Sequence, residues 1–257
     1  MCAKSPVGLP GQRKVTTGEA GSGRRISGRR TRGRKTGEMA DLDLITSLRT
    51  SGSVRGFTND VVTDEAVHAI LNVARFAPSG GNAQGWRVIN AKSAESRTKL
   101  AEWSQTTWNE YVAQRNSGRR PFAADESGRW PGPGDLDFAN VPHSPNPLLD
   151  ALNTVPIVLV IAADLGDLAA MDTDLDRVQF CAGASIYPFC WSILLAARAH
   201  GLGGVMTTFV VRREPEVKTF LGLGPREAVA AMICLGVPTH QNTKLTRRPV
   251  DDFYRTV

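Results

Sequence analysis

Ala77-Pro78-Ser79-Gly80-Gly81-Asn82-Ala83-Gln84-Gly85-Trp86 stands between a helix pattern and a strand pattern, where a functional loop is expected. The helix pattern starts at Thr63-Asp64-Glu65, and apolar residues then recur at the spacing of one buried helical face. Pro78 ends this helix, because a residue that precedes proline avoids the α conformation. The run from Trp86 to Ile89 then predicts a strand.

The composition of this loop favours a ligand. Gly80 and Gly81 allow close approach of the backbone, and the carboxamides of Asn82 and Gln84 both donate and accept hydrogen bonds. Such a set suits a flat heterocycle with alternating donors and acceptors, for example a flavin or a purine. The alternative is a plain helix-to-strand turn, because Gly, Asn and Ser are common in turns of every kind.

The same stretch resembles the Ala-Pro-Ser-Gly-x-Asn-x-Gln-x-Trp motif of the nitroreductase superfamily, the FMN-dependent NAD(P)H oxidoreductases. The resemblance implies that Pro78, Ser79 and Gly80 pack against the flavin ring and that Asn82 and Gln84 bind its polar edge. It also implies an α+β sandwich with a central mixed, mainly antiparallel sheet covered by helices. In this family the fold forms an intertwined homodimer, with two FMN sites that are lined by both subunits.

An upstream element, Ser51-Gly52-Ser53-Val54-Arg55-Gly56-Phe57, resembles the family's Arg-Arg-Ser-Val-Arg-x-Phe, which binds the flavin phosphate and ribityl chain. Ser53 and Arg55 match, and arginine suits phosphate because its planar fork fits the oxygens. Ser51 and Gly52 stand where the two leading arginines are expected. Arg49 lies just upstream and is a candidate substitute. The alternative for Arg55 is an ordinary solvated surface charge.

Two later elements also resemble parts of the family's flavin site. Lys244 to Pro249 is similar to the C-terminal Lys/Arg-x-Arg-x-Pro, so Arg247 or Arg248 is expected to reach the same phosphate. A solvated basic run is the alternative. Residues 203–208 resemble the family's strand entry, which places Gly204, Thr207 and Thr208 near the flavin ring. The threonines equally suit a plain strand, because they are β-branched.

The remaining patterns complete an α+β architecture. Pro188 is expected to kink its helix or to mark the first turn. We predict helices over residues 41–50, 64–77, 95–114, 177–200 and from 214, and strands over residues 86–91, 155–163, 205–211 and 228–235.

Residues 117–150 contain six prolines, which makes regular structure improbable. Phe122, Trp130 and Phe138 within this stretch favour a lid over simple disorder, and a surface insertion with a few aromatic residues is the alternative. We place the lid or insertion at about residues 100–150 of a domain that runs from 39 to 257. The aromatic residues expected to stack on an acceptor are Trp103, Trp108, Tyr111, Phe122 and Trp130.

The basic excess lies at the N-terminus. Residues 1–38 hold ten Lys and Arg residues but only two acidic ones, whereas the whole chain has a net charge of +6. This composition predicts a disordered arm. Three interpretations stay open: an arm that binds nucleic acid, a transit-like segment, or a start codon placed upstream of Met39.

Other classes find little support in the sequence. The four cysteines form no Cys-x-x-Cys pair and the four histidines are scattered, so we expect free thiols in a reducing cytoplasm and no metal site. No apolar run is long enough to span a membrane. Walker A, Gly-x-Ser-x-Gly and His-Glu-x-x-His sequences do not occur.

The resemblance implies ping-pong turnover, in which NAD(P)H reduces FMN and a nitroaromatic or quinone then reoxidises it. NADPH is favoured as the donor. No residue is expected to be catalytic, because the chemistry belongs to the cofactor. Two alternatives remain, namely reductive dehalogenation or flavin fragmentation on the same fold, and a flavin-free nucleic-acid-binding protein that acts through the basic arm.

Overall fold

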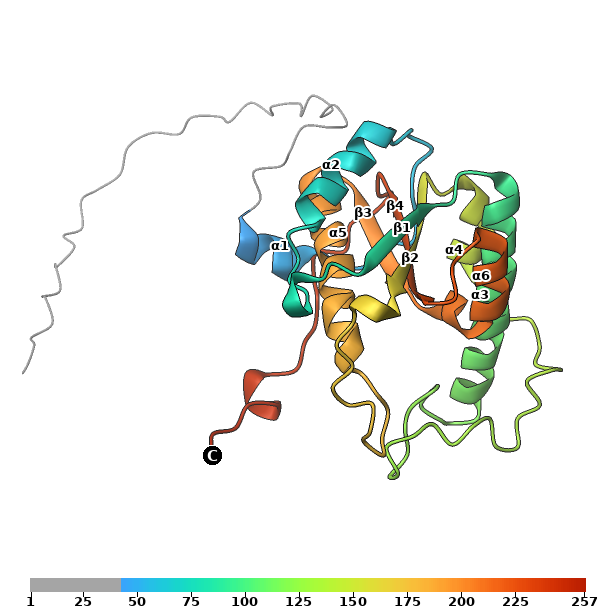
Figure 1. The fold of residues 1–257 in the computed structure, drawn as a ribbon. Helices are drawn as coiled ribbons and strands as arrows, with labels where there is room; N and C mark the ends of the chain where they lie inside the picture. Colours follow the sequence, from blue (N-terminus) through green and yellow to red (C-terminus); the bar gives the residue numbers. More distant parts are fainter. Residues whose placement is uncertain (1–42) are drawn as a thin grey trace, which may run out of the picture. The chain divides into compact units, whose positions relative to one another are not determined.

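The computed structural model describes residues 43–257 (Figure 1). The predicted basic arm, residues 1–38, lies outside the described residues. The helices and strands are α1 (Leu44–Thr50), α2 (Asp64–Ala74), β1 (Trp86–Asn90), α3 (Ala94–Asn116), α4 (Pro147–Asp150), β2 (Ile157–Asp164), α5 (Tyr187–Ala199), β3 (Gly203–Thr207), α6 (Glu214–Leu221) and β4 (Glu227–Gly236).

The sheet has the strand order β1-β2-β4-β3, and every neighbouring pair is antiparallel. Helices α2 and α5 cover one face, and α3, α4 and α6 cover the other (Figure 1). Strand β2 is buried along its whole length and divides its side chains between the two faces. Ile157, Leu159 and Ile161 join the core under α5, while Val158 and Val160 join the core under α3. The predicted α+β class is confirmed.

Helix α2 begins where its cap predicts. The hydroxyl of Thr63 accepts a hydrogen bond from the backbone N–H of Ala66 at 3.3 Å, which satisfies one free donor of the first turn. Val67, Ile70 and Ala74 are buried on one face, as the apolar spacing predicted. The helix ends at Ala74, three residues before the predicted end, and residues 75–77 form a turn that leads to Pro78.

The predicted helix over 177–200 was wrong in its first ten residues. Helix α5 starts at Tyr187, and residues 181–185 form a separate 3-10 turn. Pro188 has no N–H and its ring would clash with a preceding helical turn, so it stands in the first turn of α5. The carboxylate of Asp172 also accepts from the backbone N–H groups of Phe180 and Cys181, at 2.9 and 3.3 Å, which offers this segment an alternative to helix.

The predicted strand over 205–211 was too long. Strand β3 ends at Thr207, whose hydroxyl accepts from the backbone N–H of Phe209 at 3.3 Å. Residues 209–213 then form a 3-10 turn that packs on α3. The β-branched composition of the segment is compatible with strand, but a local side-chain acceptor and packing on α3 decide its conformation.

Asp172 sits in a buried position and links three parts of the loop that precedes α5. Its side chain also receives a hydrogen bond from Arg177 at 2.7 Å and is only 2% exposed. The N–H of Phe180 and then the Arg177 guanidinium hold the pKa of Asp172 well below its ordinary value of 3.8. In the folded chain this carboxylate is therefore ionised at lower pH than in the unfolded chain, which stabilises the fold above about pH 4.

We therefore expect Asp172→Asn to be less stable than the wild type near neutrality, and this difference to shrink below about pH 4 as the wild-type carboxylate takes up its proton. Urea unfolding midpoints of both proteins from about pH 7 to about pH 2 measure this change. A stability difference that stays constant over the whole range would contradict the role of the charge.

Three of the four cysteines lie within the described residues. Cys190 and Cys234 are free and buried, and burial raises the pKa of both thiols to about 12. Cys181 is free and partly buried, and Cys2 lies outside the described residues. Within residues 43–257 no helix has the length and apolarity needed to cross a membrane, and no group of three or more potential metal ligands occurs.

Candidate functional site

The loop between α2 and β1 is anchored on the turn before α5. The backbone N–H of Gly80 donates to the hydroxyl of Ser185 at 3.0 Å, and the hydroxyl of Ser79 accepts from the backbone N–H of Gln84 at 3.1 Å. Pro78 and Gly80 are exposed. The side chain of a residue 105 positions away thus holds the backbone of this loop against the turn that precedes α5.

Asn82 and Gln84 both have left-handed backbone conformations, with φ of 55° and 54°. This region is costly for residues other than glycine, and such strain concentrates at ligand sites. The Gln84 amide donates to the backbone and side-chain oxygens of Asn82, both at 3.2 Å, so the two carboxamides lie together. Both residues are exposed. The loop therefore presents two linked amides to solvent.

The segment that contains Ser53 runs beside the start of β3. Val54 donates its backbone N–H to the carbonyl of Gly204 at 2.9 Å, and the Gln241 amide donates to the carbonyl of Gly52 at 3.0 Å. These bonds place Ser53 and Gly204 on the wall of the same small cavity, which has a volume of about 30 Å³. The segment that the sequence predicted for phosphate binding and the strand entry predicted near the flavin ring are therefore neighbours.

This small cavity contains two polar atoms that sequence reasoning missed. Arg198 and Gln241 line it, and Arg198 Nε and Gln241 Oε1 are buried without a hydrogen-bond partner. A cavity of this size has room for a water molecule but not for a phosphate. A phosphate would therefore lie outside the cavity, against Ser53. Arg198 lies in the last turn of α5, where basic residues are common because they interact favourably with the helix dipole. Its position in the sequence therefore did not indicate a binding role.

The predicted arginines are all at the surface. Arg49, Arg55 and Arg248 are exposed and take part in no ion pair among the described residues, while Arg247 donates to the carbonyl of Thr246 at 2.8 Å. The tail approaches the Ser53 segment just before Arg247, since Asn242 accepts from Gly52 at 3.2 Å.

A second cavity, of about 520 Å³, lies where the end of β3 meets α3 and the predicted lid. We call it the aromatic cavity. It brings together Thr208 with Tyr111, Phe122 and Trp130, four residues that the sequence assigned to the flavin or to the acceptor. Its lining residues are Thr107, Tyr111, Pro121, Phe122, Trp130, Tyr187, Thr208, Phe209, Val211 and Arg212.

The other predicted residues lie nearby or elsewhere. Trp108 stacks on Tyr111 with ring centroids 5.5 Å apart, just behind the aromatic cavity. Trp103 packs edge-on against Phe220 of α6 at 5.6 Å and does not line the cavity. Thr207 turns its hydroxyl to the backbone of the following 3-10 turn. Phe209 and Arg212 were not among the predicted site residues. The strand predicted over residues 205–211 covered most of the 3-10 turn, residues 209–213, that carries them.

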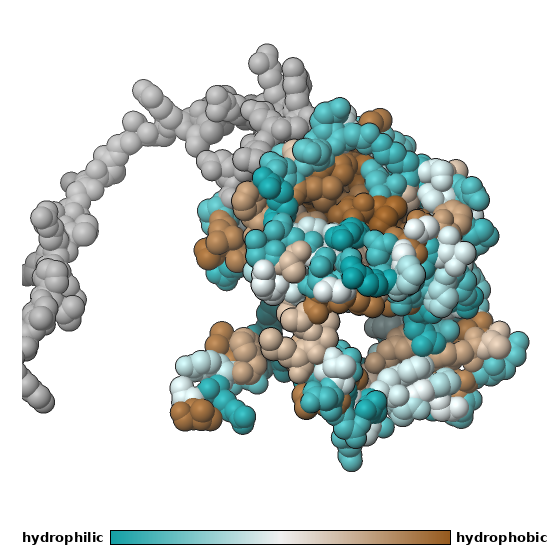
Figure 2. Space-filling model, in the orientation of Figure 1, coloured by the Kyte–Doolittle hydropathy of each residue, from teal (hydrophilic) through white to brown (hydrophobic). Residues whose placement is uncertain are grey.

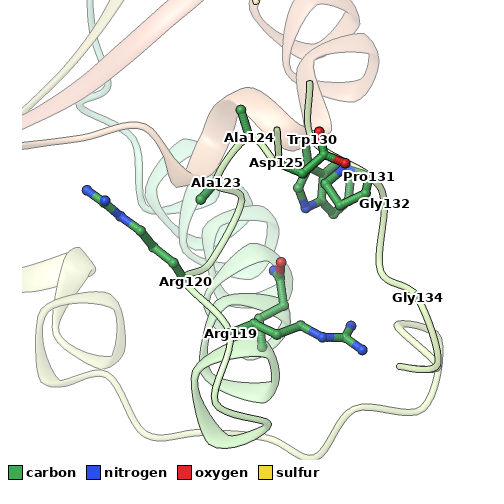
Figure 3. Close-up of a pocket in the computed structure, with 10 residues that line it drawn as sticks. Arg119, Arg120, Ala123, Ala124, Asp125, Trp130, Pro131, Gly132 and Gly134 are labelled. Carbon is green, nitrogen blue, oxygen red and sulfur yellow. The ribbon is translucent and has the colours of Figure 1, made fainter. Parts of the chain in front are cut away.

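The lid segment, residues 117–146, has no regular helix or strand but is tied down at several points. Figure 3 shows its first part beside the end of α3, with Arg119 directed toward Gly134 and Arg120 pointing away. The buried amide of Gln114 accepts from the backbone N–H of Phe122 at 3.2 Å. A further cavity of about 470 Å³ lies here, and Trp130 borders both it and the aromatic cavity.

A model of the nitroreductase family matches residues 49–237, which is most of the chain. The chain belongs to this family. The match includes the loop between α2 and β1, the Ser53 segment after Arg49 and the complete sheet, and it makes the protein an oxidoreductase of the nitroreductase fold.

Individual members differ in activity. Nitrobenzene nitroreductase from Ectopseudomonas oleovorans is 29% identical over 213 residues, which cover 76% of this chain and 85% of that protein. Human iodotyrosine deiodinase 1 is 25% identical over 207 residues, or 80% of this chain, and the chain spans 65% of the length of that relative. The structure of the Vibrio harveyi NADPH:FMN oxidoreductase complexed with NAD+ matches with a TM-score of 0.56 and 20% identity, over 83% of this chain and 78% of that one, which shows the fold.

In this chain the predicted residues of the Asn82 loop and of the Ser53 segment form two groups along α5. The Asn82 loop contacts the turn before the helix at Ser185, whereas the Ser53 segment shares its cavity with Leu194 and Arg198 toward the far end. Ser185 and Arg198 are separated by roughly 15–20 Å at about 1.5 Å per helical residue. One chain therefore presents the amides and the phosphate-binding candidates at separate places.

Proposed function

We propose that this protein is an FMN-dependent oxidoreductase that uses NAD(P)H, with NADPH favoured, to reduce nitroaromatic or quinone acceptors by a ping-pong mechanism. The observation that carries the proposal is the aromatic cavity, which joins Thr208 to the rings of Tyr111, Phe122 and Trp130. Its volume of about 520 Å³ suits a small planar acceptor, because ligand sites of this kind measure about 300–1,000 Å³. The similarity to a nitrobenzene nitroreductase supports the same acceptor class.

The residues present fit FMN. Asn82 and Gln84 supply exposed donors and acceptors for the polar edge of a flavin ring, and their left-handed conformations are of the kind that ligand sites tolerate. Ser53 and Arg55, with Arg247 or Arg248 from the tail, would bind the phosphate. When bound, FMN would accept two electrons from NAD(P)H and deliver them to the acceptor.

The protein's own contribution is then to bind, orient and exclude water. The rings of Tyr111, Phe122 and Trp130 would stack on the acceptor, and offset or edge-on contacts between aromatic rings contribute about 0.5–1.5 kcal/mol each beyond burial. Phe122 and Trp130 already contact each other with centroids 5.3 Å apart, so this wall is formed before a ligand arrives. Lid closure over the cavity would keep water from the reacting atoms.

A homodimer would bring the two parts of the proposed flavin site together. Helix α1 has no buried residue, and Leu44, Ile45 and Leu48 are 66%, 61% and 42% exposed. Phe253 and Tyr254 of the tail are also about two thirds exposed, at 65% and 64%. Figure 2 shows hydrophobic surface at both places, on α1 and at the end of the chain. Exposed apolar surface of this extent is typical of protein interfaces, and a second copy of the chain would bury it and bring one chain's Asn82 loop to the other's Ser53 segment.

The first experiment is the visible spectrum of the purified protein. We expect a flavin spectrum that bleaches with NADPH under anaerobic conditions and returns when nitrobenzene is added. Light scattering should show a dimer with FMN bound. A colourless protein that takes up no added FMN contradicts the proposal, and a flavin that NADPH and NADH both fail to bleach contradicts the choice of donor.

Reductive dehalogenation is a second candidate, favoured by the similarity to iodotyrosine deiodinase 1 over 80% of this chain. The aromatic cavity would accept a halogenated phenol as readily as a nitroaromatic ring. Adding 3-iodotyrosine or nitrobenzene to the NADPH-reduced protein separates the two. Faster reoxidation by 3-iodotyrosine, with release of iodide, would favour the dehalogenase.

Two further predictions concern the chain as a whole. A cytoplasmic location stays a prediction. Nucleic-acid binding would depend on residues 1–38, which lie outside the described structure. Deleting these residues should leave reductase activity intact, whereas a salt-sensitive association with DNA that disappears on deletion would assign the arm a separate role.

A further inference from the structure

The aromatic cavity carries a charge that an uncharged acceptor would not need. Among the ten described residues that line it, Arg212 is the one with a formal charge. Its guanidinium carbon lies 5.2 Å from the ring centroids of both Phe122 and Trp130. The guanidinium is thus held against two lid rings, where it is shielded from part of the solvent and where its electrostatic attraction for an anion is stronger than in water.

One side of this guanidinium is already occupied. Arg212 Nε donates to Glu110 Oε2 at 3.1 Å, and Nη2 lies 3.1 Å from the same oxygen. The Glu110 side chain is 10% exposed and belongs to α3, and Glu110 does not line the cavity. The ion pair therefore fixes the orientation of Arg212. The remaining nitrogen, Nη1, has no hydrogen-bond partner among the described residues, and the side chain is 40% exposed.

A second residue of the cavity wall carries a polar group without a partner. Thr107 lines the aromatic cavity, is 2% exposed, and its hydroxyl is buried with no hydrogen bond. Thr107 and Tyr111 lie one helical turn apart on α3, so their side chains share a face. The Thr107 hydroxyl is closed off from the cavity contents, so Arg212 Nη1 is the charged donor on this wall that remains free for an acceptor atom of a ligand.

We propose that Arg212 selects acceptors that carry a carboxylate on the aromatic ring. The ring would stack on Phe122 and Trp130, and the carboxylate would accept from Arg212 Nη1. Arginine suits this role because its planar group binds carboxylates through charge-assisted hydrogen bonds. The inference rests on the proposed function and names the substrate class of the same site.

The test compares 4-nitrobenzoate with 4-nitrobenzamide, which has nearly the same size and no charge. We expect the wild type to prefer the benzoate, and Arg212→Gln to reduce the ratio of kcat/KM for benzoate over benzamide by about tenfold, the effect of one charge-assisted hydrogen bond. The double variant Arg212→Gln with Glu110→Gln avoids leaving a buried carboxylate unpaired, and it should show the same reduction.

Arg213→Gln is the matched control. It removes the same charge one residue further along, from a side chain that pairs with Glu216 and does not line the cavity. An unchanged benzoate-to-benzamide ratio in this variant supports a direct contact of Arg212. An equal loss in both variants, or no loss in Arg212→Gln and the double variant, overturns the proposal.

A binding measurement separates this inference from the proposed function. Benzoate and benzamide are titrated into the oxidised protein, and quenching of tryptophan fluorescence is followed. If neither nitro compound is turned over, the proposed function fails. If Arg212→Gln binds 4-nitrobenzoate more weakly than the wild type does, without a matching loss for 4-nitrobenzamide, the carboxylate site is still supported. If wild type and variant bind both compounds equally, the carboxylate site is overturned.

Discussion

Gly204→Ala is expected to lower the free energy of unfolding by about 3 kcal/mol, the upper part of the range for overpacking a core. A Cβ atom at Gly204 would lie 2.8 Å from the carbonyl oxygen of Cys234 and 3.0 Å from a methyl group of Leu194, and it would meet Leu235 more closely still. The carbonyl belongs to β4 in the middle of the sheet, so it cannot move aside without breaking the β3–β4 pairing. Urea unfolding measures the loss.

Gly224→Ala is the control for this prediction. A Cβ there would meet only the side chain of Glu227, at 3.5 Å, which is an ordinary contact. Replacing a glycine without strain reduces the entropy of the unfolded chain, so this variant should be unchanged or slightly more stable. Similar losses for both variants would show that close packing at Gly204 is not the cause.

Asn82→Gly is expected to weaken FMN binding by about thirtyfold, because two hydrogen bonds of about 1 kcal/mol each are lost. Glycine is the informative replacement here. Asn82 has a φ of 55°, and glycine adopts this conformation freely, so the loop keeps its path while the carboxamide disappears. Titration of the apoprotein with FMN, followed by quenching of flavin fluorescence, measures the dissociation constant.

Asn59→Gly provides the comparison, since Asn59 is an exposed residue of the loop before α2 with no part in the proposed site. We expect its FMN affinity to equal that of the wild type. If Asn82→Gly also binds FMN with wild-type affinity, Asn82 must be removed from the site.

Mixed dimers of Asn82→Gly and Arg55→Ala chains extend this experiment to the shared site. If the Asn82 loop and the Arg55 segment of different chains meet at one FMN, each mixed dimer has one intact site and one with both changes. Random mixing of equal amounts should then restore tight binding at about a quarter of all sites. Sites built from a single chain would regain none.

Much of the framework was predictable because its signals are local. The cap at Thr63, the apolar spacing that follows it and Pro78 placed α2 and the loop within a few residues of where they lie. The buried run of β2 was recognised because a central strand is apolar on both faces. The nitroreductase family followed from the same loop, and the family match confirms it.

The start of α5 and the end of β3 were misplaced for a common reason. The Asp172 carboxylate and the Thr207 hydroxyl each offer the backbone a hydrogen bond that competes with regular structure. Apolar and β-branched composition does not report such local competition, which depends on where a side chain points.

The sequence by itself determined the helices with clear caps, the apolar strands and the chemistry of the loop from Pro78 to Gln84, because these depend on neighbours along the chain. Only the tertiary structure decided which groups meet. Gly80 binds Ser185 across 105 positions, and Arg212 reaches Glu110 across 102. Arg198 and Gln241 share a cavity with Ser53 for the same reason. Such contacts arise when the sheet brings distant segments together, and no periodicity or spacing in the sequence encodes the pairing of two polar side chains so far apart.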